Sequence, residues 1–181
     1  MAAIIPSLST IRGMTAGERR FGRRLEAHLE DDYTVWYDVP VGRQRRYPDF
    51  IILHPSRGLL FLEVKDWKLA TLKKISKDRV TLQTHNGLEV VSNPLEQARQ
   101  YAQTTVNVLK ADPQLRQPEG RYQGRLCCPY GYGVVLTNIT RQQWNKALLE
   151  EHQELVLPAH RVICKDAVSY THLTLPTIYS V

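Results

Sequence analysis

The heptapeptide Leu-Leu-Phe-Leu-Glu-Val-Lys at residues 59–65 decides the fold, because it is an apolar run that ends in an acid and a base. A run this apolar has no side that suits water, so it predicts a central β-strand covered on both faces. Burying a carboxylate there is unfavourable unless the group is paired, protonated or bound to a metal. Glu63 and Lys65 lie two residues apart and therefore point to the same face of the strand.

A second carboxylate, Asp49, begins the apolar segment that precedes this strand. If Leu53 pairs with Leu59 across the intervening turn, Asp49 stands opposite Glu63, with Cβ atoms about 5 Å apart. A register shifted by one residue would place the two acids on opposite faces. Two carboxylates this close repel each other, and Mg²⁺, which accepts one or two carboxylates, would relieve the repulsion. The alternative is a plain ion cluster in which Lys65 neutralises one carboxylate.

The remaining pattern predicts a single α/β domain in which helices flank a central mixed β-sheet. A capping box of Thr15 and Glu18 begins a helix over 16–30, and an Asn-Pro pair begins a second helix over 93–109. A third helix is expected over 140–150. Further strands are expected over 33–39, 72–75, 79–83, 88–91, 133–137 and 154–164.

The composition excludes several classes of protein. The chain has 181 residues, and 24 Lys and Arg against 18 Asp and Glu give a formal net charge of +6. With 43% hydrophobic and 23% charged residues, it is neither disordered nor fibrous. No apolar run approaches the ~20 residues of a membrane span, and three cysteines, two of them adjacent, make neither a disulfide framework nor a spaced zinc site. We therefore expect a cytoplasmic protein without a membrane partner, and the basic excess permits an anionic one.

Three segments are expected along the chain. Residues 1–14 form an irregular lead-in without a signal-peptide pattern, and residues 15–167 form the domain. Residues 168–181 contain no Lys, Arg, Asp or Glu and resemble a translated transposase-end sequencing adapter. We expect this tail to be a read-through artefact and the chain to be the front part of a longer protein.

Several short motifs, in this order, resemble the NERD (nuclease-related) domain of the PD-(D/E)xK nuclease superfamily. They are Gly17-Glu18, Asp49, Glu63-Val64-Lys65-Asp66-Trp67 and Asn93-Pro94-Leu95-Glu96-Gln97. The resemblance is strongest over residues 15–110 and looser from Pro113 onward. It implies a restriction-endonuclease-like core, often fused to a helicase or kinase module, so we expect a helicase-like module in the same protein.

The resemblance also implies a role for each residue of the central motif. Asp49 and Glu63 would bind Mg²⁺, or Mn²⁺, beside the scissile phosphate, and the backbone carbonyl of Val64 would add a ligand. Lys65 would orient or deprotonate the attacking water and offset charge in the transition state. The implied activity is metal-dependent hydrolysis of DNA phosphodiester bonds.

Two helix residues are weaker candidates for this catalytic set. By the resemblance, Glu18 from the first helix and Gln97 from the second would lie at the edge of the site. Glu18 is equally explained by its capping box, and Gln97 is an ordinary helix residue. Tyr101, one helical turn after Gln97, can reach the same cleft or belong to the core.

Arginines before Asp49 are candidates for DNA contact, because phosphate groups are bound by such clusters. They are Arg43, Arg45 and Arg46. The alternative is a solvated loop, and the arginines of the first helix favour only a solvated helix face. Two rival functions remain open: a non-catalytic DNA-binding or docking module with a nuclease-like fold, and a structural domain with an inert ion cluster.

Overall fold

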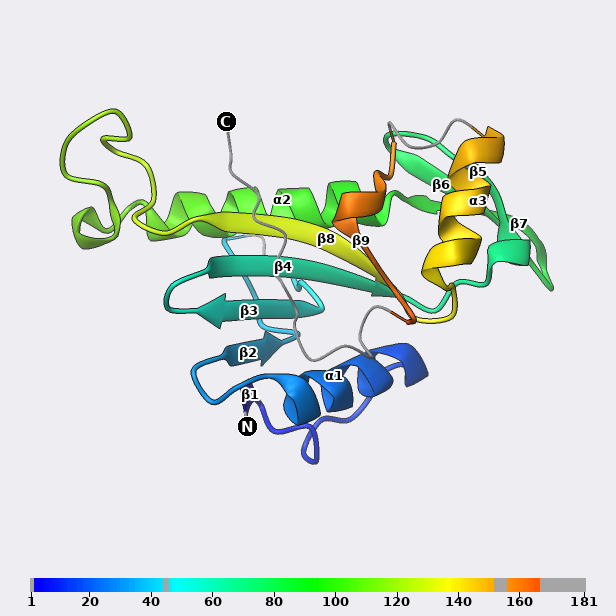
Figure 1. Cartoon of the computed structure of the whole chain (residues 1–181), viewed down its shortest axis with the longest axis horizontal. Helices are drawn as coiled ribbons and strands as arrows, with labels where there is room; N and C mark the ends of the chain where they lie inside the picture. The colour runs from blue at the N-terminus through cyan, green and yellow to red at the C-terminus, as the bar shows by residue number, and fades with distance from the viewer. Residues whose placement is uncertain (1, 44–45, 152–155, 167–181) are drawn as a thin grey trace.

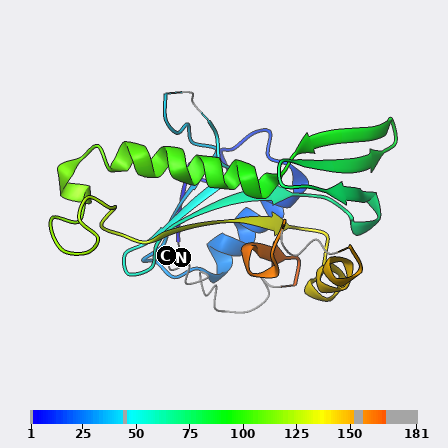
Figure 2. The same cartoon turned by 90° about the horizontal axis from the view of Figure 1, so that it is seen from above.

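The structure is a computed structural model, and it describes residues 2–43, 46–151 and 156–166. A central β-sheet carries helix α1 (Ala16–His28) on one face and helix α2 (Pro94–Leu109) on the other, as Figure 1 and the view from above in Figure 2 show. The expected α/β class, a mixed sheet flanked by helices, is confirmed. No helix in the described part of the chain is long and apolar enough to cross a membrane.

The central sheet has six strands in the order β1-β2-β3-β4-β8-β9. Its strands are β1 (Ala3–Ile5), β2 (Thr34–Tyr37), β3 (Phe50–His54), β4 (Gly58–Lys65), β8 (Tyr130–Leu136) and β9 (Val162–Cys164). Only β3 runs antiparallel to its neighbours, and the β1–β2, β4–β8 and β8–β9 pairs are parallel. The central position of β4, between β3 and β8, confirms the prediction from its apolar sequence.

Two expectations at the ends of the domain are wrong in part. The lead-in contains β1, which pairs in parallel with β2, and a strand of three residues is too short to show a periodicity. Near the other end, Ala159–Arg161 is a 3-10 turn, η4, and only β9 is a strand. Residues 154 and 155 of the expected strand and the whole expected tail, 168–181, lie outside the described residues.

A second, three-stranded sheet lies between β4 and α2 in the sequence. It consists of β5 (Leu72–Ile75), β6 (Arg79–Thr84) and β7 (Gly87–Ser92), preceded by a 3-10 turn, η1 (Leu69–Thr71). Asn93 joins this sheet to α2: its side chain caps Leu95 N–H, and its amide donates to the carbonyl of Ser76 at 2.9 Å. The remaining elements, η2 (Pro113–Leu115) and α3 (Arg141–Glu151), follow α2 and β8.

Strand β4 separates two cores. Alternate residues Leu60, Leu62 and Val64 pack on the α1 side, where Phe21 and Phe50 also lie, with ring centroids 5.2 Å apart. The other set, which includes Leu59 and Phe61, packs on the α2 side with residues such as Ala102 and Val106. Because strand residues alternate in direction, the side chains of Glu63 and Lys65 belong to the α2 face.

Candidate active site

The hairpin of β3 and β4 brings Asp49 to Glu63. The expected pairing of Leu53 with Leu59 is confirmed, and the same register continues to Phe50 opposite Leu62. Asp49 lies one residue before β3, and its Oδ2 accepts a hydrogen bond of 2.6 Å from the backbone N–H of Val64. The carboxylate of Asp49 is therefore held against the end of β4, beside Glu63, which the register places opposite it.

Glu63 is a buried carboxylate, 5% exposed, with two differently placed oxygens. Its Oε1 accepts a hydrogen bond of 2.7 Å from Nζ of Lys65, whose side chain is 24% exposed. Its Oε2 is buried and has no hydrogen-bond partner among the described residues. An unsatisfied buried carboxylate oxygen is energetically costly, so this atom is a strong candidate for a cation ligand.

Burial makes both acids hard to ionise. It raises the pKa of Asp49 to about 7, with the negative charge of Glu63 as the second cause, while the Val64 N–H and Lys65 act in the opposite direction. Burial also raises the pKa of Glu63, and Lys65 offsets part of that effect. At neutral pH the two acids are therefore only partly ionised. A bound cation would favour the ionised form of both.

Helix α1 contributes Glu18 to this site. The capping box is confirmed: Glu18 N–H donates to Oγ1 of Thr15 at 3.2 Å, and Thr15 N–H donates to Oε2 of Glu18 at 3.1 Å. The hydroxyl of Tyr37 also donates to that Oε2 at 2.7 Å. The charge of Glu18 raises the pKa of both Asp49 and Glu63, so it lies close to the pair. Glu18 can therefore cap the helix and lie near the site at once, and Tyr37 is a neighbour that no sequence motif indicated.

Helix α2 contributes Gln97 and Tyr101. The Gln97 side chain hydrogen-bonds to Tyr101, and burial, followed by the charges of Glu63 and Asp49, raises the pKa of the Tyr101 hydroxyl. Tyr101 also packs against the α2-side core, so it both reaches the site and belongs to the core. The structure therefore brings these two side chains to the edge of the acid pair.

The geometry agrees with a comparison of the sequence with known families. The family model of the nuclease-related domain, NERD, matches residues 14–137, more than half of the chain. The chain belongs to the NERD family. Comparison with curated proteins and with solved structures gives no match. The match supports a nuclease-related function, and it includes both acids of the pair.

The structure describes two of the three loop arginines that precede Asp49. Arg46 lies against α2, where its guanidinium donates to Oε1 of Gln100 and its charge lowers the pKa of Tyr101. Arg43 is exposed, and Arg45 lies outside the described residues. The structure thus brings Arg46 to the α2 side of the site and leaves the DNA contacts of the loop a prediction.

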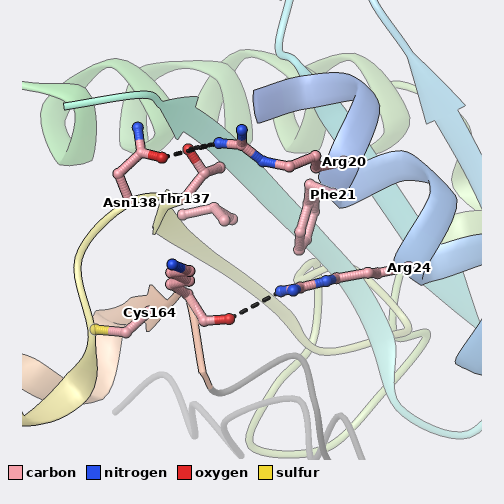
Figure 3. A pocket seen from close by; sticks show the side chains of 8 residues that line it. Arg20, Phe21, Arg24, Thr137, Asn138 and Cys164 are labelled. Atoms are coloured by element: carbon pink, nitrogen blue, oxygen red, sulfur yellow. Dashed lines mark hydrogen bonds between the residues drawn. The ribbon is translucent and has the colours of Figure 1, made fainter. Parts of the chain in front are cut away.

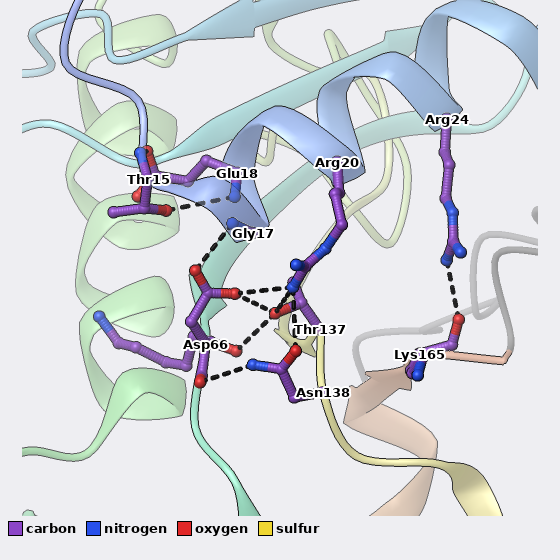
Figure 4. Close-up of polar contacts among 10 residues, drawn as sticks. Thr15, Gly17, Glu18, Arg20, Arg24, Asp66, Thr137, Asn138 and Lys165 are labelled. Atoms are coloured by element: carbon purple, nitrogen blue, oxygen red, sulfur yellow. Dashed lines mark hydrogen bonds and ion pairs between the residues drawn. The ribbon is translucent and has the colours of Figure 1, made fainter.

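A polar cluster centred on Asp66 fixes helix α1 of the NERD domain beside the pair (Figure 4). Oδ2 of Asp66 accepts a hydrogen bond of 2.7 Å from the backbone N–H of Gly17. Its Oδ1 contacts Arg20 at 3.3 Å and accepts a hydrogen bond from the hydroxyl of Thr137. A Cβ on Gly17 would lie 1.8 Å from that Oδ1, so any other residue here would have to displace the Asp66 carboxylate. Because Glu18 follows Gly17, this contact also places Glu18.

The oxygen atoms at the site fit a hard divalent cation. In the described part of the chain, no group of three or more His, Cys, Asp or Glu side chains is placed to hold a metal. The side-chain oxygens that a cation could use at this site are those of the Asp49 and Glu63 carboxylates. Thr137 N–H donates to the Lys65 carbonyl at 3.1 Å. Adjacent residues of a strand direct their backbone groups to opposite edges, so the Val64 carbonyl faces the edge where Asp49 lies. Mg²⁺ suits such a set, because it keeps several waters.

Proposed function

We propose that this NERD domain is a Mg²⁺-dependent nuclease that hydrolyses DNA phosphodiester bonds. The observation that carries the proposal is the Oε2 atom of Glu63, a buried acceptor without a partner among the described residues, beside the carboxylate of Asp49. Lys65 supplies a cation 2.7 Å from the same carboxylate. Membership of the family supports a nuclease-related function. The metal, the DNA substrate and the hydrolysis are our proposal.

The residues divide the chemistry between them. Asp49, Glu63 and the carbonyl of Val64 would hold Mg²⁺, which polarises a phosphoryl oxygen and lowers the pKa of bound water. Asp49 must lose its proton before it can bind a cation, and burial favours the protonated form. Mg²⁺ would therefore bind more readily as the pH rises through about 7. The hydrogen bond to Glu63 fixes Lys65, whose ammonium would orient the attacking water and offset charge on the phosphoryl oxygens. To deprotonate that water instead, Lys65 would have to be the neutral amine, which then takes up the proton.

The edge of the site would contact the substrate. Glu18, held by Tyr37 at 2.7 Å, places a third carboxylate near the pair, where it would orient a metal-bound water. Gln97 and Tyr101 present an amide and a hydroxyl from α2. Arg46 would contact a phosphate of the DNA from the same side.

One observation favours a second candidate, a DNA-binding or docking module without turnover. Lys65 already forms an ion pair of 2.7 Å with Glu63, and this pair neutralises one acid without any metal. Burial keeps a proton on Asp49 up to a pH of about 7, which removes much of the remaining repulsion. The cluster can therefore be stable as an ion pair beside a protonated acid.

Cleavage assays separate the two candidates. Supercoiled plasmid and single-stranded DNA are incubated with the protein in Mg²⁺ or EDTA, and Glu63→Gln is compared with Glu89→Gln, an exposed carboxylate on β7. We expect Mg²⁺-dependent cleavage by the wild type and by Glu89→Gln, and a loss on the order of 10²-fold or more in Glu63→Gln. DNA binding without metal-dependent cleavage by the wild type would support the second candidate instead.

A further inference from the structure

A second polar cavity, of about 200 Å³, lies on the α1 face of the central sheet (Figure 3). Helix α1 forms one wall with Arg20 and Arg24, and the chain that leaves β8 and β9 forms the other with Asn138 and Lys165. The parallel strands β4, β8 and β9 all end here. The carboxyl ends of parallel strands are the usual ligand-binding edge of an open α/β sheet.

Each guanidinium in this cavity is held through one of its nitrogens. Nη1 of Arg24 donates to the backbone carbonyl of Lys165 at 2.8 Å. Nη2 of Arg20 donates to Oδ1 of Asn138 at 3.0 Å and to Oγ1 of Thr137 at 3.3 Å, and it contacts Asp66. A guanidinium has five N–H groups, so both arginines keep donors for a ligand while the bonds described here fix their position.

The charges around the cavity are unbalanced. Arg20, Arg24 and Lys165 all line it, and within the described residues only Asp66 lies at ion-pair distance from any of them. The thiol of Cys164 is also on the wall, but burial raises its pKa to about 11, so it supplies no negative charge at neutral pH. Cations gathered around one cavity repel each other, and a bound anion removes that repulsion.

We propose that this cavity binds a phosphate group, supplied by the backbone of the nucleic acid that is cleaved at Asp49 and Glu63. Guanidinium groups form paired hydrogen bonds with phosphate oxygens, so two positioned arginines and a lysine match this ligand. The cavity and the acid pair lie on opposite faces of the sheet, but both lie at the carboxyl end of β4, where Asp66, which contacts Arg20, directly follows Lys65. This proposal rests on the proposed function for its substrate, and on the cavity alone for its chemistry.

The test compares two double variants that remove the same charge. Arg24→Gln with Lys165→Gln removes two of the three cationic residues that line the cavity. Arg19→Gln with Arg23→Gln removes two arginines from another face of α1. A labelled DNA oligonucleotide is titrated in EDTA at several salt concentrations. We expect the cavity variant to bind on the order of tenfold more weakly and the salt slope to fall by about one per lost phosphate contact, with little change in the control.

Circular dichroism and thermal unfolding of each variant establish that it is folded. Lys165→Gln alone is included because the Lys165 side chain is exposed and has no side-chain partner among the described residues. An equal loss in both double variants, or wild-type affinity in the cavity variant, would overturn the proposal. DNA binding weakened only by the cavity substitutions, in a wild type that shows no metal-dependent cleavage, would support the cavity and refute the nuclease.

Titration with inorganic phosphate distinguishes the source of the ligand. Thermal stabilisation of the wild type by phosphate, lost in the cavity variant, supports the phosphate chemistry. If DNA affinity is unchanged in that variant while phosphate binding is lost, the ligand is a free phosphate compound, and the assignment to the nucleic-acid backbone is wrong.

Discussion

In EDTA, where no metal neutralises the pair, the protein should lose stability as the pH rises from 5 to 8, because of Asp49. The pKa of this acid is about 7 in the folded protein, against an ordinary value of 3.8. Between these values the folded state keeps a proton that the unfolded state has released, so unfolding releases a proton and higher pH favours it. The slope is close to 1.4 kcal/mol per pH unit near pH 5 and falls as the pH approaches the folded pKa, so the loss is about 2.3 kcal/mol between pH 5 and pH 7 and levels off above.

Urea unfolding at fixed ionic strength measures this loss. Asp49→Asn stays neutral and keeps an oxygen for the Val64 N–H, so we expect a flatter dependence of the free energy of unfolding on pH. Asp31→Asn, at an exposed acid, is the matched control and should follow the wild type. Glu63 contributes with the same sign, because its pKa is also raised, so some slope remains. A slope in Asp49→Asn as steep as in the wild type would refute the reasoning.

Three further predictions concern the site and its support. Mg²⁺ or Mn²⁺ at a hundredfold excess over Kd should stabilise the wild type by about 2.7 kcal/mol in thermal unfolding, and an equal shift in Glu63→Ala would place the ion elsewhere. Lys65→Met should reduce the cleavage rate by on the order of 10²-fold or more and leave the DNA affinity nearly unchanged, and wild-type cleavage by this variant would exclude a catalytic role. Gly17→Ala should destabilise the fold by about 1–3 kcal/mol, because its Cβ would lie 1.8 Å from Asp66, and an unchanged Tm would show that the Asp66 contact adapts.

The acid pair was accessible from the sequence because it depends on local structure. A short connection joins β3 to β4, so a single register assumption, Leu53 opposite Leu59, placed Asp49 opposite Glu63. Period-2 alternation then placed Lys65 on the same face. The capping motif of α1 and the tight turn at Gly87 are also encoded within a few residues. Local rules of this kind need no knowledge of the remaining chain.

Contacts between distant segments were not accessible in the same way. Asp66 reaches Gly17 and Thr137, and Tyr37 reaches Glu18, through packing that no spacing in the sequence encodes. Strand β1 depends on an edge that exists only after β2 has formed. The convergence of Arg24 and Lys165 on one cavity likewise requires the sheet that joins them.

The sheet of β5, β6 and β7 has a consequence for how such domains diversify. It lies in the sequence between the strand that carries Lys65 and the helix that carries Gln97. The residue that follows it, Asn93, is 1% exposed and hydrogen-bonds to Ser76 of the sheet region and to the first turn of α2. Its far turn at Gly87 has nothing within 4 Å of an added Cβ. The turn can therefore change length, or receive a foreign peptide, while Asn93 keeps its hydrogen bonds to Ser76 and to the start of α2.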